Sequence, residues 1–194
     1  MRVCRTKGRS LQTTVVVPCF NEAERLNVEA YLRFADRTVG IRLLLVNDGS
    51  GDQTLDVLQH LSTLRPQSFA VCDLSENQGK AEAVRHGVLH ACQLGAEYVG
   101  YWDADLATPL EAICDFRSVL QRRPNIDIVL GSRLPLAGRD IQRRPLRRML
   151  GRTFASVASK VVRMPIYDTQ CGAKLFRVND RTTSVFRHPF QARW

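Results

Sequence analysis

Residues 98–105 read Tyr-Val-Gly-Tyr-Trp-Asp-Ala-Asp, a short apolar run that ends in two carboxylates separated by one residue. The apolar part has the length of a buried β-strand, and it stops where the acidic residues begin. In an extended chain, residues i and i+2 project toward the same side, so Asp103 and Asp105 can share one hard cation. A solvated turn with Asp105 at a helix start would carry the same letters, so the pair alone leaves both interpretations open.

Apolar runs of the same kind occur throughout the chain and alternate with stretches of helical period. Strands are expected at residues 14–17, 41–46, 69–72, 98–102 and 126–130. Helices are expected at residues 22–36 and 55–64, from 77–80 to about 94, and from a capped start at Thr108, Pro109 and Glu111. This alternation predicts right-handed crossovers and an α/β fold, with a mostly parallel central sheet and helices on both faces.

The polar segments that follow the expected strands should gather at one edge of this sheet. Ligands of such folds bind in the crevice at the carboxyl ends of the strands. The polar segments fall at those ends, namely Asn21-Glu22 and residues 47–52, 77–80 and 103–105. One crevice is therefore expected to collect them, which favours a metal-binding role for Asp103 and Asp105 over a solvated turn.

Two of these segments carry weak signals of their own. Asn47-Asp48-Gly49-Ser50 has the composition of an Asx turn that leads into a helix, and Asp48 can also accept hydrogen bonds from a nucleobase or ribose. Asn77-Gln78-Gly79-Lys80 begins a helix, where Gly79 lets an anion approach backbone N–H groups and Lys80 adds a positive charge. Neither segment is a Walker A loop or a G-x-G-x-x-G motif.

The composition describes one globular domain with a basic surface. The 194 residues are 44% hydrophobic and 24% charged, which excludes a disordered tail or a disulfide-stapled mini-protein. The formal net charge of +9 favours anionic partners such as phosphates, nucleic acid or acidic lipid surfaces. No apolar run reaches the roughly 18 residues of a membrane helix. Six single cysteines without a C-x-x-C pair indicate reduced thiols in a cytosolic compartment.

Most of the net positive charge is concentrated between residues 133 and 163. This segment contains nine basic residues and one acidic residue, a net charge of +8. Its apolar residues recur at helical spacing, which predicts a basic amphipathic helix over about 145–162. The candidates to bind a phosphate are Arg133, which directly follows a strand, and one or two of Arg147, Arg148 and Arg152.

Taken in order, six short motifs resemble those of the family 2 glycosyltransferases. They are Val15-Val16-Val17-Pro18-Cys19-Phe20-Asn21-Glu22, Asn47-Asp48-Gly49-Ser50, Asn77-Gln78-Gly79-Lys80, Asp103-Ala104-Asp105, Gly131-Ser132-Arg133 and Asp168-Thr169-Gln170-Cys171-Gly172-Ala173-Lys174. The resemblance covers about residues 13–177 and is nearest to the branch of dolichyl-phosphate glucosyltransferases and dolichyl-phosphate mannose synthases. It implies the GT-A fold, the Rossmann-like fold of nucleotide-diphospho-sugar transferases.

The resemblance also implies a role for each matching residue. The residues implied to bind a nucleotide-sugar donor, of the UDP-glucose or GDP-mannose class, are Pro18, Asn21, Glu22, Asp48, Gly79, Lys80 and Asp103. Asp103 and Asp105 are implied to hold Mg²⁺ or Mn²⁺. The implied catalytic group is Asp103, Asp105, Arg133 and Asp168, and the implied acceptor-phosphate group is Arg133, Arg147, Arg148 and Lys174.

The implied activity is an inverting hexosyl transfer from the nucleotide-sugar to a polyprenyl or dolichyl phosphate. The cation neutralises the leaving diphosphate while a phosphate oxygen of the acceptor attacks the anomeric carbon from the opposite side. That phosphate, with a second pKa of about 6, is largely ionised near neutral pH, so it needs arginines more than a general base. A saccharide hydroxyl acceptor, with Asp168 or Asp105 as base, a donor-binding but inactive fragment, and a basic nucleic-acid-binding domain remain open as alternatives.

The motifs also set the expected domain boundaries and location. Residues 1–12 are expected to be a flexible N-terminal segment, 13–180 the catalytic domain and 181–194 a C-terminal tail. Members with the signature of residues 168–172 commonly continue beyond an aromatic segment, so an end at Trp194 indicates truncation.

The lipid acceptor is expected to be met peripherally, through the basic helix, on the cytoplasmic face of a membrane. A nucleic-acid partner is not expected. The reason is that Phe154 is the only aromatic residue of the 133–163 segment that could stack on bases.

Overall fold

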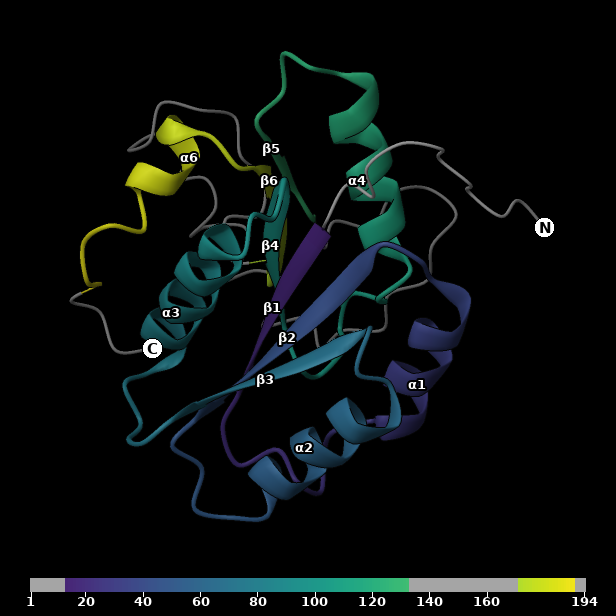
Figure 1. Ribbon diagram of the computed structural model, residues 1–194, viewed down its shortest axis with the longest axis vertical. Helices are drawn as coiled ribbons and strands as arrows, with labels where there is room; N and C mark the ends of the chain where they lie inside the picture. Colours follow the sequence, from purple (N-terminus) through teal and green to yellow (C-terminus); the bar gives the residue numbers. More distant parts are fainter. Residues whose placement is uncertain (1–12, 133–170, 191–194) are drawn as a thin grey trace, which may run out of the picture. The chain divides into compact units, whose positions relative to one another are not determined.

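The computed structural model describes residues 13–132 and 171–190 (Figure 1). The chain divides into two compact units, residues 1–129 with 173–194, and residues 130–172. The first unit contains the central sheet and the helices described below. The expected N-terminal segment at 1–12 and the expected basic helix lie outside the described residues.

Six strands of the described residues form one sheet, in the order β3-β2-β1-β4-β6-β5. Their bounds are β1 (Thr13–Cys19), β2 (Ile41–Asp48), β3 (Phe69–Leu74), β4 (Tyr98–Trp102), β5 (Ile128–Leu130) and β6 (Ala173–Arg177). β1 pairs in parallel with β2 and β4, and β2 pairs in parallel with β3, whereas β6 runs antiparallel to β4. The expectation of a mostly parallel α/β sheet is confirmed.

The helices cover both faces of this sheet, as expected. Their bounds are α1 (Val28–Arg37), α2 (Thr54–Leu64), α3 (Lys80–Gln93), α4 (Ala112–Arg122) and α6 (Asp180–Ser184). α3 packs on one face, against β1, β2 and β4, while α1, α2 and α4 lie on the opposite side (Figure 1). β1 and β2 are buried on both faces, which explains why their sequences are continuous apolar runs rather than alternating ones.

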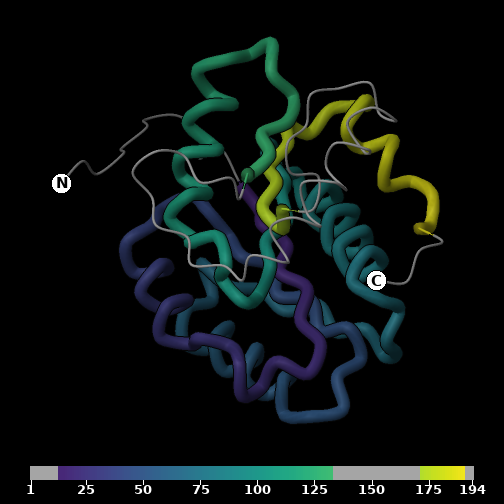
Figure 2. The backbone as a smooth tube through the Cα atoms, turned by 180° about the vertical axis from the view of Figure 1, so that it is seen from behind, coloured from purple at the N-terminus to yellow at the C-terminus, as the bar shows by residue number. Residues whose placement is uncertain are grey.

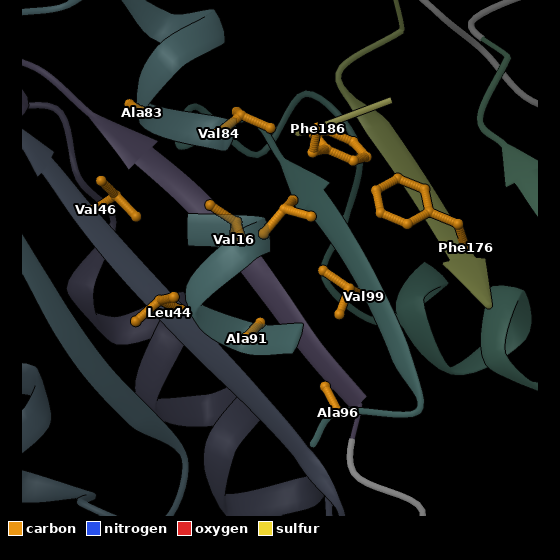
Figure 3. Close-up of a cluster of buried hydrophobic side chains, with 11 residues drawn as sticks. Val16, Leu44, Val46, Ala83, Val84, Ala91, Ala96, Val99, Phe176 and Phe186 are labelled. Atoms are coloured by element: carbon orange, nitrogen blue, oxygen red, sulfur yellow. The ribbon is translucent and has the colours of Figure 1, made fainter. Parts of the chain in front are cut away.

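The core beneath α3 depends on a glycine in the middle of that helix. A Cβ atom at Gly87 would lie 2.5 Å from Cγ1 of Val16 and 3.0 Å from Cγ2 of Val46, so the helix backbone approaches the sheet closely. Figure 3 shows the resulting cluster, in which valines and leucines of β1 and β2 face alanines and Val84 of α3. Phe176 of β6 and Phe186, beyond α6, complete this cluster.

Two helices begin later than the sequence predicts. α1 begins at Val28 rather than near residue 22, because the Asn27 side chain caps the helix by accepting a hydrogen bond from the backbone N–H of Ala30 at 3.1 Å. The expected Thr108 cap of α4 is wrong, since the helix begins at Ala112. The backbone N–H of Ala112 instead donates to the carbonyl of Pro109 at 3.1 Å, which closes a turn before the helix.

The sequence prediction also missed one strand. Ala173–Arg177 is β6, inserted between β4 and β5, and it is not among the strands expected from the sequence. Across 13–132 and 171–190, no helix combines the length and the apolar composition needed to cross a bilayer. Within the same ranges, the cysteines at 19, 72, 92, 114 and 171 form no disulfide, which agrees with the expectation for them.

Candidate functional site

A cavity of about 370 Å³ opens at the carboxyl ends of β1, β2 and β4. Its walls come from four segments that lie far apart in the sequence. The lining residues are Pro18, Cys19, Phe20, Glu22, Asp48, Asn77, Gly79, Lys80, Asp103, Ala104 and Asp105. The polar segments at the strand ends therefore meet in one crevice, as the sequence predicts.

The last residues of β1 form one wall of this cavity. Pairing between β1 and β4 ends at Val16 and Tyr101, so Pro18, which has no N–H group, leaves no sheet bond with β4 unmade. Burial raises the pKa of the Cys19 thiol to about 12. The Cys19 thiol is therefore protonated near neutral pH, which makes it a poor nucleophile.

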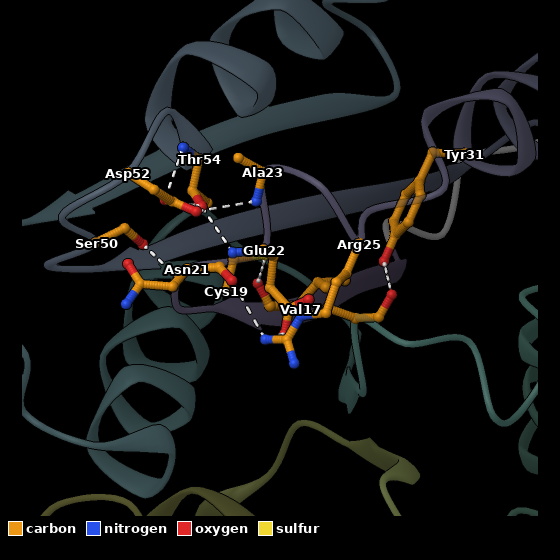
Figure 4. A network of polar contacts seen from close by, with 11 residues as sticks. Val17, Cys19, Asn21, Glu22, Ala23, Arg25, Tyr31, Ser50, Asp52 and Thr54 are labelled. Carbon is orange, nitrogen blue, oxygen red and sulfur yellow. Dashed lines mark hydrogen bonds and ion pairs between the residues drawn. The ribbon is translucent and has the colours of Figure 1, made fainter.

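The loop after β1 is tied to the loop after β2 by Asn21. Its backbone N–H donates to Oγ of Ser50 at 3.1 Å (Figure 4). Its side-chain Oδ1 accepts from the N–H of Gly51 at 3.0 Å. Asn21 has a φ of 53°, in the left-handed region that asparagine tolerates better than most residues. Asn21 does not itself line the cavity, but it holds the loop that carries Phe20 and Glu22 into the cavity lining.

Glu22 is held by the beginning of α2. Its backbone N–H donates to Oγ1 of Thr54 at 2.8 Å, and Oδ2 of Asp52 accepts from the N–H of Ala23 at 3.3 Å (Figure 4). Oδ1 of Asp52 also accepts from the N–H of Thr54 at 3.0 Å. Sequence reasoning missed Asp52 and Thr54, although an acid two residues before a threonine at a helix start is a recognisable turn signal.

The carboxylates around the cavity influence one another. Burial raises the pKa of Glu22, the Arg25 guanidinium at 3.0 Å opposes this, and the charges of Asp105 and Asp52 raise it further. Tyr31 is buried behind the same wall, and its hydroxyl donates to the carbonyl of Ala104 at 3.4 Å. Burial and nearby negative charges raise the pKa of Tyr31 well above its usual range. The cavity is thus a site of concentrated negative charge.

Asp48 joins the end of β2 to the beginning of α3. The side chain is 2% exposed, and its two oxygens accept from the backbone N–H groups of Gln78 at 2.8 Å and Gly79 at 3.0 Å. Gly49 follows with a φ of +62°, and a Cβ there would lie 2.4 Å from the backbone N of Asn77. Each carboxylate oxygen keeps a second lone pair, so the predicted contact of Asp48 with a nucleoside is compatible with this tether.

Asn47 organises residues 47–50 through its side chain, but its hydrogen bond spans three residues rather than the two of the expected Asx turn. Oδ1 of Asn47 accepts from the N–H of Ser50 at 3.3 Å, and its Nδ2 donates to Oδ1 of Asp73 on β3 at 2.7 Å. The loop after β2 is therefore fixed both within itself and to the neighbouring strand.

Asp103 and Asp105 enter the cavity from the end of β4. Oδ1 of Asp103 forms an ion pair with Nζ of Lys80, and Oδ1 of Asp105 accepts from the N–H of Ala107 at 2.9 Å. Within 13–132 and 171–190, no cluster of three His, Cys, Asp or Glu side chains could hold a metal alone. Mg²⁺ is commonly held by one or two carboxylates together with substrate phosphates, so this pair fits a cation whose coordination the ligand completes.

The other predicted site residues divide into one that the structure describes and others that it does not. Lys174 lies on β6 opposite Tyr101, with Nζ contacting the tyrosine hydroxyl and lying 4.9 Å from the ring centroid. It does not line the cavity. Arg133, Arg147, Arg148 and Asp168 lie outside the described residues, as does the further phosphate candidate Arg152, and their roles stay predictions.

A sequence profile of the family described as "Glycosyl transferase family 2" matches residues 14–181. Over 194 aligned residues, the chain is 30% identical to a dolichyl-phosphate beta-glucosyltransferase of Trichomonas vaginalis, covering 94% of this chain and 56% of that protein. The human dolichyl-phosphate beta-glucosyltransferase is 32% identical, with coverage of 94% and 60%. The chain thus spans a little over half the length of these curated relatives.

Solved structures share the fold at low sequence identity. Glucosyl-3-phosphoglycerate synthase of Mycobacterium tuberculosis superposes with a TM-score of 0.59 at 16% identity, covering 86% of this chain and 57% of that one. TarS of Staphylococcus aureus gives a TM-score of 0.55 at 18% identity, with coverage of 86% and 47%. Both are glycosyltransferases with the GT-A fold, so the expected fold class is confirmed.

Proposed function

Because this chain belongs to glycosyl transferase family 2, we propose that it is a hexosyltransferase that moves glucose from a nucleotide-sugar to a polyprenyl phosphate such as dolichyl phosphate. The observation that carries the proposal is the cavity where Asp103 and Asp105 face Lys80, Gly79 and Asp48. The names of the curated relatives, dolichyl-phosphate beta-glucosyltransferases, support glucose and a dolichyl phosphate acceptor.

The residues that line the cavity suit both the diphosphate and the nucleoside of a nucleotide-sugar. Gly79 is the N-cap of α3, so the positive end of that helix and the Lys80 ammonium both face the cavity and can receive a diphosphate. The nucleoside is assigned to Pro18, Glu22 and Asp48, which line the same cavity. We propose UDP as the nucleotide, although structures of the same fold were solved both with UDP and Mn²⁺ and with GDP-mannose and Mn²⁺, so the tests below compare both nucleotides.

A divalent cation, Mg²⁺ or Mn²⁺, is assigned to Asp103 and Asp105. When bound, it supplies positive charge that stabilises the leaving diphosphate. Lys80 adds a second positive charge beside the same group, because its ammonium already lies against Asp103. Exchange of this partner for a diphosphate oxygen costs little, since the Lys80 side chain is 47% exposed.

The acceptor phosphate needs no general base, because it is already ionised near neutral pH. Its attack on the face of the sugar opposite the diphosphate inverts the anomeric configuration, which converts an α-linked donor into a β-linked product. Arg133, Arg147, Arg148 and Lys174 are proposed to receive the acceptor phosphate, and Asp168 is proposed to act near the reacting sugar. The site is proposed to work at the cytoplasmic face of a membrane, with the basic segment at 133–163 on the lipid surface.

The test is a transfer assay with radiolabelled UDP-glucose and Mn²⁺, offering a polyprenyl phosphate and a saccharide alcohol as separate acceptors. Label in the lipid fraction, dependent on the metal, is the expected result. Label on the saccharide alone would replace the proposed acceptor with a hydroxyl, for which Asp105 in the cavity is the described candidate base.

A companion thermal-shift measurement compares UDP- and GDP-sugars with and without Mn²⁺. Donor binding without turnover, with turnover restored in a longer chain of the same protein, would identify this chain as an inactive donor-binding fragment. Because the curated relatives are longer than this chain, the comparison with a longer chain is included in the experiment from the start.

A further inference from the structure

Glu82 is a buried acid in the first turn of α3, two residues after Lys80. Its Oε2 accepts from Nε of Arg85 at 2.8 Å, and its Oε1 accepts from the backbone N–H of Phe190. Nε2 of His86 lies 4.0 Å from Oε2. Burial raises the pKa of Glu82, but the bonds from Arg85 and Phe190 outweigh it, so the net pKa lies below its usual range. Glu82 is therefore an anion near neutral pH.

The described residues that follow β6, 178–190, run beside α3, as the views from the front and from behind both show (Figures 1 and 2). Nη1 of Arg85 donates to the carbonyl of Phe186 at 3.4 Å. The ring of Phe186 is buried in the core, 5.4 Å from that of Phe176 and 6.1 Å from that of Phe190. Two adjacent turns of α3 are thus bonded to the C-terminal segment, which the sequence prediction treated as a tail.

The same helix turn is bonded to the cavity on its other side. Asp48 accepts from the N–H of Gly79, and Asp103 pairs with Lys80. In a capping box, an acid at the third helical position accepts the N–H of the N-cap residue. Here Asp48 takes that N–H from Gly79, which has no side chain to cap the helix, and Glu82 is left to bind Phe190 instead.

From this arrangement we propose that Glu82 is a positioning residue for the donor diphosphate: it ties the first turn of α3 to the C-terminal segment and so fixes Gly79 and Lys80 at the cavity wall. That the ligand at this turn is a donor diphosphate rests on the proposed function. The first N–H groups of a helix have no partner within the helix, so the first turn frays unless other groups hold it. An anion site at that turn is only as well ordered as the turn itself.

The test compares Glu82→Gln with the parent protein in two measurements. Amide hydrogen exchange should quicken about tenfold in the peptide covering residues 78–86, because the loss of a charged hydrogen-bond acceptor lets the first turn open. Affinity for UDP should fall about fivefold or more, whereas affinity for uridine, which has no phosphate, should stay unchanged. The ratio of the two affinities separates positioning of the diphosphate from a general loss of structure.

Two further variants make the result specific. Glu82→Asp keeps the charge beside Arg85 but shortens the side chain by one methylene, so it should lose the bond to Phe190 and show the same drop in the affinity ratio. If Glu82→Gln does not fold, Glu82→Asp alone tests the positioning role. Glu29→Gln is the control, since Glu29 is in the first turn of α1 and its pair with Arg33 at 3.3 Å is exposed.

An unchanged ratio of UDP to uridine affinity in both Glu82 variants would overturn the positioning role, as would an equal loss for both ligands. A parent protein that binds neither UDP nor GDP would instead overturn the proposed function. In that case the exchange measurement still decides whether Glu82 holds the first turn of α3, and unchanged exchange would reject the tether itself.

Discussion

Lys80 and Asp103 face each other in the cavity, where the lysine occupies a carboxylate oxygen that a divalent cation would use. The ion pair is partly exposed, so its contribution to folding is small, about 1 kcal/mol or less. Asp103 is therefore expected to matter for ligand binding far more than for the stability of the fold.

Asp103→Asn and Asp105→Asn should each abolish the part of UDP binding that depends on Mn²⁺. A neutral carboxamide is a much poorer ligand for a hard cation than a carboxylate. The measurement is the UDP-induced thermal shift with and without MnCl₂. Asp56→Asn, an exposed acid in the first turn of α2, is the matched control. If both variants kept the full metal-dependent thermal shift, Asp103 and Asp105 would not be the residues that hold the metal.

Gly49→Ala should destabilise the fold by about 2–4 kcal/mol. About 1–2 kcal/mol comes from a positive φ in a residue with a Cβ, and the rest from the contact at 2.4 Å with the backbone of residues 76 and 77. Alanine variants at two other glycines, measured by urea unfolding, separate these two causes. Gly95→Ala carries only the φ cost, with no atom within 4 Å, and Gly51→Ala carries neither. Equal losses of stability in Gly49→Ala and Gly95→Ala would show that the backbone around Gly49 can move to accommodate the added Cβ.

At the scale of elements, α3 is the helix that brings the core and the cavity together. Its middle lies against β1 and β2 through Gly87, and its first turn carries Lys80 into the cavity. A change in how closely α3 approaches the sheet would therefore shift the cavity wall as well as the core. The short distances at Gly87 predict that a larger residue there would destabilise the packing of α3 on the sheet.

Gly87→Ala should destabilise the fold by about 1–2 kcal/mol, although alanine is the better helix former by about 1 kcal/mol. The added Cβ would lie 2.5 Å from a methyl group of Val16, and valine cannot easily rotate away. Val16→Ala opens this space, so the double variant should be more stable than the sum of the single changes predicts, by about 1 kcal/mol. Strict additivity in urea unfolding would contradict the close approach.

The elements that the sequence predicts well are those whose pattern is local. β1, β2 and β4 are continuous apolar runs, and the polar residues that end them correctly predict the crevice. β6 was missed because its five residues acquire their partner from β4, which lies more than seventy residues earlier in the chain. The start of α1 was misplaced because the apolar spacing continues through residues 22–26, and only the cap at Asn27 marks the true beginning.

The residues of the candidate site also divide into those with a local sequence pattern and those that depend on contacts between distant segments. Asp48, Lys80, Asp103 and Asp105 are found from motifs, because each follows a strand end or begins a helix. Asp52, Thr54 and Glu82 act on backbone groups of distant segments. Such contacts leave no periodic trace in the sequence, so only the folded chain reveals them.

For the whole molecule, stability should fall as pH decreases below about 4.3, the ordinary pKa of glutamate. The pKa of Glu82 is lowered in the folded protein, so its contribution is present above that value and is lost as pH falls through its lowered pKa. The pKa of Glu22 is raised, so its contribution has the opposite sign and is lost as pH rises.

Urea midpoints measured between about pH 5 and pH 3 check both signs. Glu82→Gln should flatten the acid-side decline, and Glu22→Gln should steepen it, because it removes the opposing contribution. The same slope in both variants would contradict the opposite pKa directions of these two acids.

Net charge is also a property of the whole chain, and its uneven distribution predicts how the protein meets lipid. Of the formal charge of +9, residues 133–163 carry +8. Each basic residue near an anionic surface contributes about 1 kcal/mol. The protein should therefore sediment with vesicles that contain phosphatidylserine and not with phosphatidylcholine alone, and added salt should release it.

Two triple variants of equal net charge test whether the segment or the total charge is responsible. Replacement of Arg147, Arg148 and Arg152 by Gln removes about 3 kcal/mol, so partitioning should fall about 100-fold. Replacement of Arg37, Arg122 and Arg123, which are exposed and outside the segment, should lower it much less. Equal losses would assign the attraction to net charge alone. If the parent protein does not sediment with either vesicle, the peripheral membrane proposal fails while the donor cavity stands.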